Sequence, residues 1–274
     1  MTRIEHDLAV ALVDGEAMSL SDAKLALTDE GVSRGDGAFE TIGVWGGSPF
    51  RLEEHLSRLG ASLAKCLLPS ADTDALRRDV AHALDGVASD AMLRCYVTAS
   101  GTRAVTLTGQ PRRDPVRRLT PQLAPWIVPP AQYGLAGAKT MSYGPNMAAT
   151  RAAVRAGADD ALLLASDGTV LEGPTFCLLW VAAGTVFTVP LARGIVDSIS
   201  RRTLRELAVA AGYPVEDAEI GLTMLAEADE VAVCSSVRPL TAVTQIGPHS
   251  FPGPNPVVGT LAAALESARR TPSA

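Results

Sequence analysis

The chain has 274 residues, of which 47% are hydrophobic and 20% charged, and a formal net charge of −6. This length is enough for two modest domains with a large buried core. The acidic balance excludes a general nucleic-acid surface, because phosphate binding needs a concentrated basic face, and no stretch approaches the roughly 20 apolar residues of a membrane span.

The first half of the chain reads as an α+β unit. We expect strands at 8–13 and 39–45, separated by a glycine-rich turn segment. A helix is predicted over 52–67, where leucines recur at helical spacing and charged side chains, Arg58 and Lys65 among them, lie on the opposite face. A second helix is expected at 72–85, with strands at 91–99 and 104–108.

The second half begins after a proline-rich stretch. We therefore expect an N-terminal α+β domain at 1–118, an inter-domain linker at 119–131 and a larger C-terminal domain at 132–274. Within the latter, helices are predicted at 145–156, 198–211, 222–227 and 257–269. Strands are predicted at 160–165, 169–171, 176–182, 185–188, 215–220 and 230–234.

Cysteine and histidine usage argues against a metal site. The four cysteines are widely spaced, without a C-x-x-C pair, and the four histidines are scattered. A disulfide framework is not expected either, and this usage fits a reducing cytoplasm. The N-terminal residues do not have the pattern of a signal peptide.

Lysine occurs at only three positions, and one of them suits covalent chemistry. A Schiff-base lysine needs an amine that can be neutral, which favours a site shielded from water. Lys24 lies in a polar segment and Lys65 on the exposed side of its helix. Lys139 follows Gly134, Ala136, Gly137 and Ala138, and no acidic residue lies within a dozen positions of it. Such small neighbours let a bulky ring approach the backbone. Its local sequence also fits a solvent-exposed loop lysine.

Five segments, in order, decide between these alternatives. They are G-D-G-A-F-E-T from residue 35 with R-L-E-E-H-L-S-R-L from residue 51, K-T-M-S-Y-G-P-N-M from residue 139, the run from 159 to L-E-G-P at 171–174, G-I-V-D-S-I-S-R at 194–201, and A-D-E-V-A-V-C-S-S-V at 228–237. This set resembles the fold-type IV (class IV aminotransferase-like) enzymes, which depend on pyridoxal 5′-phosphate (PLP).

The resemblance implies a two-domain fold of the D-amino-acid aminotransferase type, with a β-barrel-like C-terminal domain that carries helices. It implies Lys139 as the catalytic Schiff-base lysine and general base, and Glu172 facing the pyridine nitrogen. It assigns the phosphate to Arg51, Ile199, Ser200, Ser235 and Ser236, and a ring contact to Tyr143. Each also has a structural interpretation: an exposed arginine or glutamate, helix caps for the serines, a core position for Tyr143.

Two reactions are compatible with this resemblance. The C-S-S-V-R segment and the L-E-G-P-T turn resemble 4-amino-4-deoxychorismate lyases, which give 4-aminobenzoate and pyruvate for folate synthesis. The alternative is an aminotransferase for D-amino or branched-chain amino acids, favoured by Glu40 at a position where the lyases have threonine. Thr41 is adjacent but would point to the opposite face of the strand. A third possibility is a catalytically idle binding protein on the same fold.

Substrate carboxylates call for arginine, and the candidates are Arg34, Arg103 and Arg238, each of which is otherwise a surface residue. The sequence departs from the family pattern at Glu30, at Ala242 and in F-C-L-L-W at 176–180, which lacks an asparagine. The partners expected are a small-molecule substrate and, from the resemblance, a second copy in a homodimer.

Overall fold

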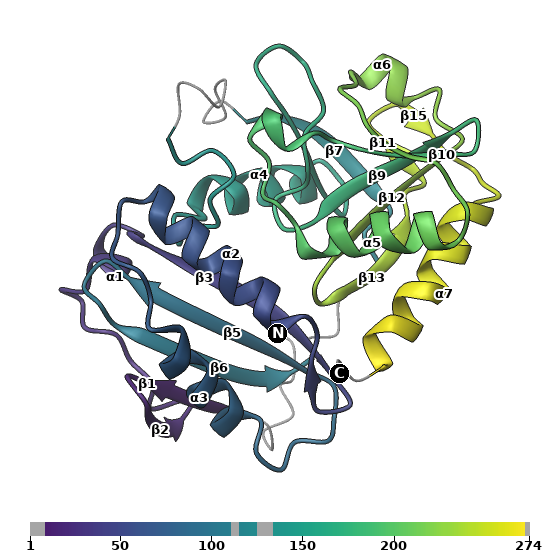
Figure 1. Cartoon of the computed structure of the whole chain (residues 1–274). Coiled ribbons are helices and arrows are strands. Elements are labelled where there is room, and N and C mark those ends of the chain that lie inside the picture. The colour runs from purple at the N-terminus through teal and green to yellow at the C-terminus, as the bar shows by residue number, and fades with distance from the viewer. Residues whose placement is uncertain (1–8, 111–114, 125–133, 272–274) are drawn as a thin grey trace. The chain divides into compact units, whose positions relative to one another are not determined.

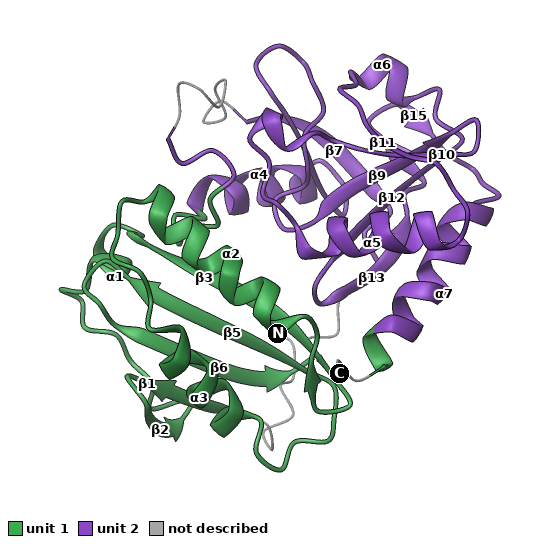
Figure 2. Ribbon diagram, viewed as in Figure 1, with its two compact units in different colours: residues 1–113, 138–143, 269–274 green, residues 114–137, 144–268 purple. Residues whose placement is uncertain are grey.

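The computed structural model describes residues 9–110, 115–124 and 134–271. The chain divides into two compact units (Figures 1 and 2). Unit 1 comprises residues 1–113, 138–143 and 269–274, and unit 2 comprises 114–137 and 144–268. Lys139 therefore belongs to unit 1, although the segments on both sides of 138–143 belong to unit 2. The boundaries expected from the sequence, 1–118 and 132–274, stay a prediction.

Unit 1 is built on an antiparallel sheet. Among its described residues the strand order is β2-β1-β6-β5-β3-β4. The strands are β1 (Val10–Val13), β2 (Glu16–Ser19), β3 (Gly37–Trp45), β4 (Ser48–Pro49), β5 (Ala91–Thr98) and β6 (Arg103–Gly109). The longest pairing joins β3 to β5, with Phe39 opposite Tyr96 and Thr41 opposite Arg94. Because side chains alternate along a strand, these four share one face of the sheet and Glu40 lies on the other.

The face that carries Glu40 is covered by helices α2 (Leu52–Lys65) and α3 (Thr73–Ala83). Leu56, Leu59 and Leu63 of α2 are buried against Ile42 and Leu93 of the sheet, as the leucine spacing predicts. Helix α3 begins at Asp72, whose carboxylate caps it by accepting the N–H of Ala75 at 2.9 Å. A short helix, α1 (Glu30–Ser33), precedes the G-D-G turn.

The described strands of unit 2 form two sheets. The first has the order β15-β14-β7-β8 and comprises β7 (Arg118–Leu123), β8 (Asp160–Leu164), β14 (Gln245–Ile246) and β15 (His249–Ser250). The second has the order β11-β10-β9-β12-β13 and comprises β9 (Cys177–Ala182), β10 (Thr185–Thr188), β11 (Val215–Asp217), β12 (Glu230–Ser235) and β13 (Arg238–Ala242). Neither sheet closes into a barrel in the part of unit 2 that the structure describes, whereas its mixed α+β character agrees with the sequence.

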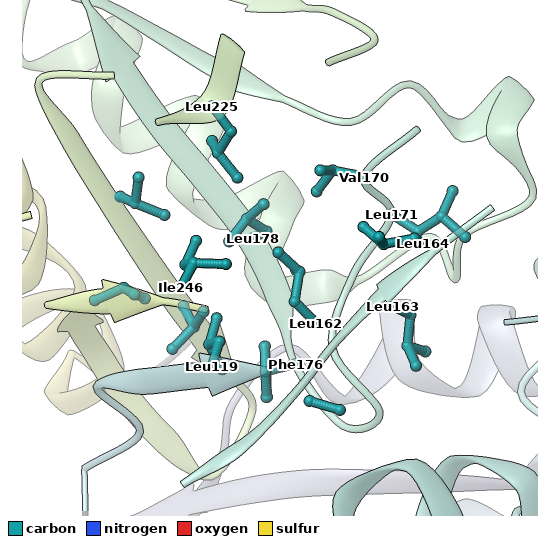
Figure 3. Packing of buried hydrophobic residues seen from close by; sticks show 14 of the residues in the cluster. Leu119, Leu162, Leu163, Leu164, Val170, Leu171, Phe176, Leu178, Leu225 and Ile246 are labelled. Carbon is teal, nitrogen blue, oxygen red and sulfur yellow. The ribbon is translucent and has the colours of Figure 1, made fainter. Parts of the chain in front are cut away.

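The second sheet is buried on both faces. Cys177, Leu179 and Val181 pack with helices α5 (Ile199–Ala210) and α7 (Pro256–Arg270), while Leu178 and Trp180 enter the core beneath the first sheet. Figure 3 shows part of that core, where Leu119, Leu162, Leu178 and Ile246 come together from four different strands. This double burial explains why the β9 sequence is a continuous apolar run rather than an alternating one.

Part of the expected linker is a strand. Residues 119–123 pair in parallel with β8 as part of β7, so the proline-based prediction is wrong for them. Pro121 is tolerated there because β14 pairs only with Arg118 and Leu119, which leaves the later part of β7 at the sheet edge. Residues 125–131 of the linker lie outside the described residues.

The remaining elements are α4 (Gly144–Arg155), the 3₁₀ turn η3 (Leu191–Arg193) and α6 (Leu222–Leu225). Across the described ranges, none of the helices combines the length and the apolar character needed to cross a bilayer.

Candidate active site

The segment that carries Lys139 lies along the outer edge of β3. The N–H of Phe39 donates to the Lys139 carbonyl at 3.1 Å, the N–H of Met141 donates to the Gly37 carbonyl at 2.9 Å, and Ala38 and Thr140 form an antiparallel bridge. The N–H of Lys139 itself donates to the hydroxyl of Ser62 on α2, at 3.0 Å. The lysine is thus fixed by its backbone to both layers of unit 1.

The two glycines of the G-D-G turn, Gly35 and Gly37, allow the Lys139 segment and β5 to lie close to the backbone of this turn. Gly35 has a φ of +69°, and a Cβ there would lie 2.8 Å from the Ser142 hydroxyl and 3.1 Å from the Ser142 Cα. Gly37 has a φ of +153°, and its Cβ would lie 2.5 Å from the Val97 carbonyl oxygen. A side chain at either position would push the lysine segment or β5 away.

The Lys139 amine lies among aromatic side chains. Its Nζ is 3.2 Å from the Tyr143 hydroxyl and 4.4 Å from the centroid of the Phe39 ring. Phe39 in turn stacks on Tyr96 at 6.0 Å and meets Tyr143 edge-on at 5.1 Å. The rings attract the amine by cation–π interaction, and the Tyr143 hydroxyl is its hydrogen-bond partner among the described residues. The contact with the coenzyme ring that the resemblance implies for Tyr143 stays a prediction.

A buried charge cluster lies behind this segment. Glu40, which is 0% exposed, accepts from Arg58 Nε at 2.8 Å, from Arg58 Nη2 at 2.6 Å and pairs with His55 Nδ1 at 2.7 Å. Burial would raise the pKa of the Glu40 carboxyl, but the Arg58 guanidinium and then the His55 ring hold it at about 2. Burial also lowers the pKa of His55, although Glu40 opposes this change.

Arg58 is thus buried, and the expectation that it lies on the exposed face of its helix is wrong. The helical spacing was read correctly, but the partner that makes burial possible, Glu40, comes from a strand 18 residues earlier. Arg51 lies elsewhere, at the N-cap of α2 with a left-handed backbone, and forms an ion pair with Glu54 at 3.2 Å. Of these two arginines, only Arg58 shares a helix face with Ser62, the residue that contacts Lys139.

Glu172 belongs to unit 2 and follows β8 on a short returning segment. Its Oε1 accepts the N–H of Val196 at 3.0 Å, and its backbone pairs with Leu163. The next residue must be small, because a Cβ on Gly173 would lie 2.0 Å from the Phe176 ring. The L-E-G-P turn therefore fixes the position of a carboxylate, as a partner of a pyridine nitrogen requires.

Arg51, assigned to the phosphate, belongs to unit 1, whereas the other four residues assigned to it lie at the start of α5 and the end of β12 in unit 2. Ser198 caps α5 by accepting the N–H of Arg201, so Ile199 and Ser200 occupy the first turn, where N–H groups have no acceptor within the helix. Ser235 ends β12, and Ser236 begins the turn into β13. This N-terminus is a suitable anion site.

Cys177 connects the unit 2 candidates. Its thiol donates to the carbonyl of Cys234, the residue before Ser235, at 3.3 Å. Burial raises the pKa of this thiol, which also contacts the Ser198 hydroxyl and senses the Glu172 charge. The Cys177 thiol therefore ties β9 to the end of β12, next to Ser235.

The three arginines proposed for substrate carboxylates already have acidic partners. Arg34 pairs with Glu30 at 3.2 Å and is exposed, Arg103 pairs with Asp79 at 2.6 Å, and Arg238 lies 3.7 Å from Asp160.

Arg94 of β5, which the sequence analysis did not consider, is different. Its Nε is buried with no hydrogen-bond partner in the described part of the chain, and its Nη1 lies 3.5 Å from the Tyr96 hydroxyl. It shares the sheet face of Phe39. The alternation of β5 could have placed it there, but only the structure shows that its Nε lacks a partner.

Within the described ranges, no group of three or more His, Cys, Asp or Glu side chains is arranged to hold a metal ion. Unit 1 instead offers a half-buried amine, and unit 2 offers a fixed carboxylate and a helix N-terminus. Each considered within its own unit, these groups suit an aldehyde, a ring nitrogen and a phosphate respectively.

Comparison with known proteins defines the class to which this fold and these residues belong. Residues 37–246 match the family Amino-transferase class IV, and the chain belongs to that family. Its fold is the mixed α+β, two-domain fold of type IV transaminases, and PLP is the cofactor of this family.

Individual relatives make the likeness more specific. The chain is 28% identical to the bifunctional aminodeoxychorismate lyase / D-amino acid transaminase of Mycobacterium tuberculosis, over 94% of this chain and 98% of that one. It is similar to the PLP-bound form of a hypothetical aminotransferase of the same organism, with a TM-score of 0.87, 29% identity and coverage of 94% and 98%. It is likewise similar to the fold IV transaminase CpuTA1 of Curtobacterium pusillum, with a TM-score of 0.85, 29% identity and coverage of 93% and 98%.

Proposed function

We propose that this protein is a PLP-dependent 4-amino-4-deoxychorismate lyase that releases 4-aminobenzoate and pyruvate. The observation that carries the PLP chemistry is the Lys139 amine, held between the Phe39 ring at 4.4 Å and the Tyr143 hydroxyl at 3.2 Å. The lyase activity is supported by the C-S-S-V-R segment and by the relative named as a bifunctional lyase and D-amino acid transaminase. An aminotransferase acting on D-amino or branched-chain amino acids is the second candidate.

Each unit contributes its own part of the chemistry. Bound PLP supplies an electron sink for the bond broken at the amine-bearing carbon. Lys139 attaches the coenzyme and afterwards takes the proton from that carbon, and the Tyr143 hydroxyl orients its amine. Glu172, held by the Val196 N–H, keeps the ring nitrogen protonated. Ile199, Ser200, Ser235 and Ser236 bind the phosphate.

Two arginines near the start of α2, Arg51 and Arg58, are candidates for binding the phosphate. The sequence pattern proposes Arg51, whereas the structure favours Arg58, which is 8% exposed and is oriented by two hydrogen bonds to Glu40. A guanidinium that is fixed in this way loses little entropy when it binds an anion. If Arg58 is the ligand, Arg58→Lys weakens PLP binding about tenfold or more while Arg51→Lys leaves it within about twofold.

For the substrate carboxylate, Arg94 is a stronger candidate than Arg34, Arg103 or Arg238. A buried guanidinium nitrogen without a partner is costly, and an incoming carboxylate would remove that cost. Thr41 and Tyr96 share the same sheet face, so hydroxyl groups accompany this charge. Glu40, which differs from the lyase pattern, lies on the opposite face and is engaged by Arg58 and His55, so it does not argue against the lyase.

The test supplies the purified, PLP-loaded protein with 4-amino-4-deoxychorismate and no amino acceptor. Stoichiometric 4-aminobenzoate and pyruvate support the lyase. Keto-acid formation from D-alanine or L-leucine that requires 2-oxoglutarate, with no 4-aminobenzoate, supports the aminotransferase instead. Borohydride reduction followed by peptide mapping must place the coenzyme on Lys139, and Lys139→Ala is the matched control. A label on another residue, or none, contradicts both candidates.

A further inference from the structure

Ser62 accepts the hydrogen bond of the Lys139 N–H, which a regular β-ladder would direct to the neighbouring strand. Phe39 N–H donates to the Lys139 carbonyl, and Met141 N–H donates to the Gly37 carbonyl. In a regular antiparallel ladder with this register, the Lys139 N–H would return to the Phe39 carbonyl and complete the pair. It donates instead to Ser62 Oγ at 3.0 Å. The regular pairing therefore ends at the lysine itself.

The position of Ser62 makes this contact specific. Ser62 is 2% exposed and lies on α2, in the same turns as Leu59 and Leu63 of the core. A hydroxyl in such surroundings costs free energy unless it forms hydrogen bonds, so a purely structural role is better served by alanine. Ser62 also follows Arg58 by four residues and His55 by seven, so the three polar side chains form one stripe on α2.

We infer that Ser62 is a positioning residue for the Schiff-base lysine, an inference that rests on the role proposed for Lys139. By turning the Lys139 N–H away from the ladder, the hydroxyl sets the direction in which the Lys139 side chain leaves the backbone. That direction places the amine over the Phe39 ring and beside the Tyr143 hydroxyl. Without the hydroxyl, the Lys139 N–H loses its acceptor, and the side chain is no longer held in this direction.

The experiment compares four variants with the wild-type protein. Ser62→Ala removes the hydroxyl, and Ser62→Cys keeps the side-chain volume but replaces the oxygen with a poor acceptor. Ser62→Thr retains the hydroxyl and should restore the wild-type behaviour. Ser57→Ala, at an exposed position on the same helix, is the matched control. Urea unfolding of each variant shows whether the fold is kept, and Ser62→Cys is used if Ser62→Ala does not fold.

Two measurements decide the outcome. Hydrogen exchange of the Lys139 amide, followed without coenzyme, should accelerate about tenfold in Ser62→Ala and Ser62→Cys, as expected for the loss of one hydrogen bond. The dissociation constant of added PLP, from absorbance titration, should rise about three- to tenfold in the same variants and stay unchanged in Ser57→Ala. Unchanged Lys139 exchange or unchanged PLP affinity in both Ser62 variants overturns the inference.

The outcome is separable from that of the proposed function. If borohydride fixes no coenzyme on Lys139 of the wild-type protein, the proposed function fails. In that case the exchange measurement on coenzyme-free protein still shows whether Ser62 holds the Lys139 N–H. If Lys139 is labelled but the Ser62 variants behave like the wild type, the inference on Ser62 fails and the proposed function stands.

Discussion

Replacing Glu40 with glutamine tests the buried charge cluster of unit 1 through the pH dependence of stability. The pKa of Glu40 drops from its ordinary 4.5 to about 2 on folding, because Arg58 and His55 outweigh the effect of burial. This difference corresponds to about 3 kcal/mol of stabilisation by the ionised carboxyl. Glu40→Gln should therefore lower the free energy of unfolding of unit 1 by about 3–5 kcal/mol at pH 7, since Arg58 stays buried without its counter-charge.

The sign of the pH effect follows from the lowered pKa. The unfolded chain binds the proton first as the pH falls, so the stabilisation is complete above about pH 4.5 and is lost towards about pH 2. At about pH 3 the difference in free energy of unfolding between the wild type and the variant should be about 2 kcal/mol smaller than at pH 7. The assay is hydrogen exchange of the slowest amides of β3 and β5, which reports on unit 1 by itself.

The lowered pKa of His55 also removes stability on acidification, below about pH 6.5. Comparing Glu40 with Glu40→Gln in proteins that also carry His55→Gln removes the contribution of the imidazole to the pH dependence of stability. A gap between wild type and Glu40→Gln that stays constant from about pH 7 to about pH 3 in that background refutes the proposed electrostatic role of Glu40.

Three further predictions concern the site. Gly37→Ala places a Cβ 2.5 Å from the Val97 oxygen at a φ of +153°, so calorimetry should show unit 1 destabilised by about 1–3 kcal/mol. Glu172→Gln keeps an acceptor for the Val196 N–H and so keeps the fold, but steady-state kinetics should show kcat reduced on the order of 100-fold; a loss below about threefold contradicts the role of Glu172. Alkylation of the native protein, read by mass spectrometry, should modify Cys66 alone, because the other three cysteines are buried and burial raises the pKa of Cys95 to about 12; modification of Cys177 in the folded state contradicts the packing of β9.

Local periodicity predicted most of the elements. The helix predicted over 52–67 is Leu52–Lys65, and the helix predicted over 145–156 is Gly144–Arg155. Strand β13 was missed because it is only partly buried and contains Pro239, so its apolar pattern is weak. Strand β7 was predicted to be part of a linker because it contains Pro121. Proline is tolerated there because that part of β7 lies at the sheet edge, and this depends on the short length of β14.

The individual roles at the site were harder to predict. The motifs singled out Lys139, Tyr143 and Glu172, which lie in well-defined parts of the structure. Their roles remain proposals. Arg58, Ser62 and Arg94 could not be singled out, because their properties depend on residues that are far away in the sequence. Ser62 meets Lys139 across 77 positions, and the burial of Arg58 depends on Glu40.

The R-L-E-E-H-L-S-R-L segment is better understood as a helix with two buried stripes. One stripe consists of Leu56, Leu59 and Leu63, which pack on the sheet and anchor α2. The other consists of His55, Arg58 and Ser62, and each of these forms a hydrogen bond with Glu40 or with the backbone of Lys139. A buried polar stripe is costly unless every member is satisfied, so it restricts α2 to one register against β3 and the lysine segment. The position of the Lys139 amine is then determined by the packing of the whole unit and not by the loop that carries it.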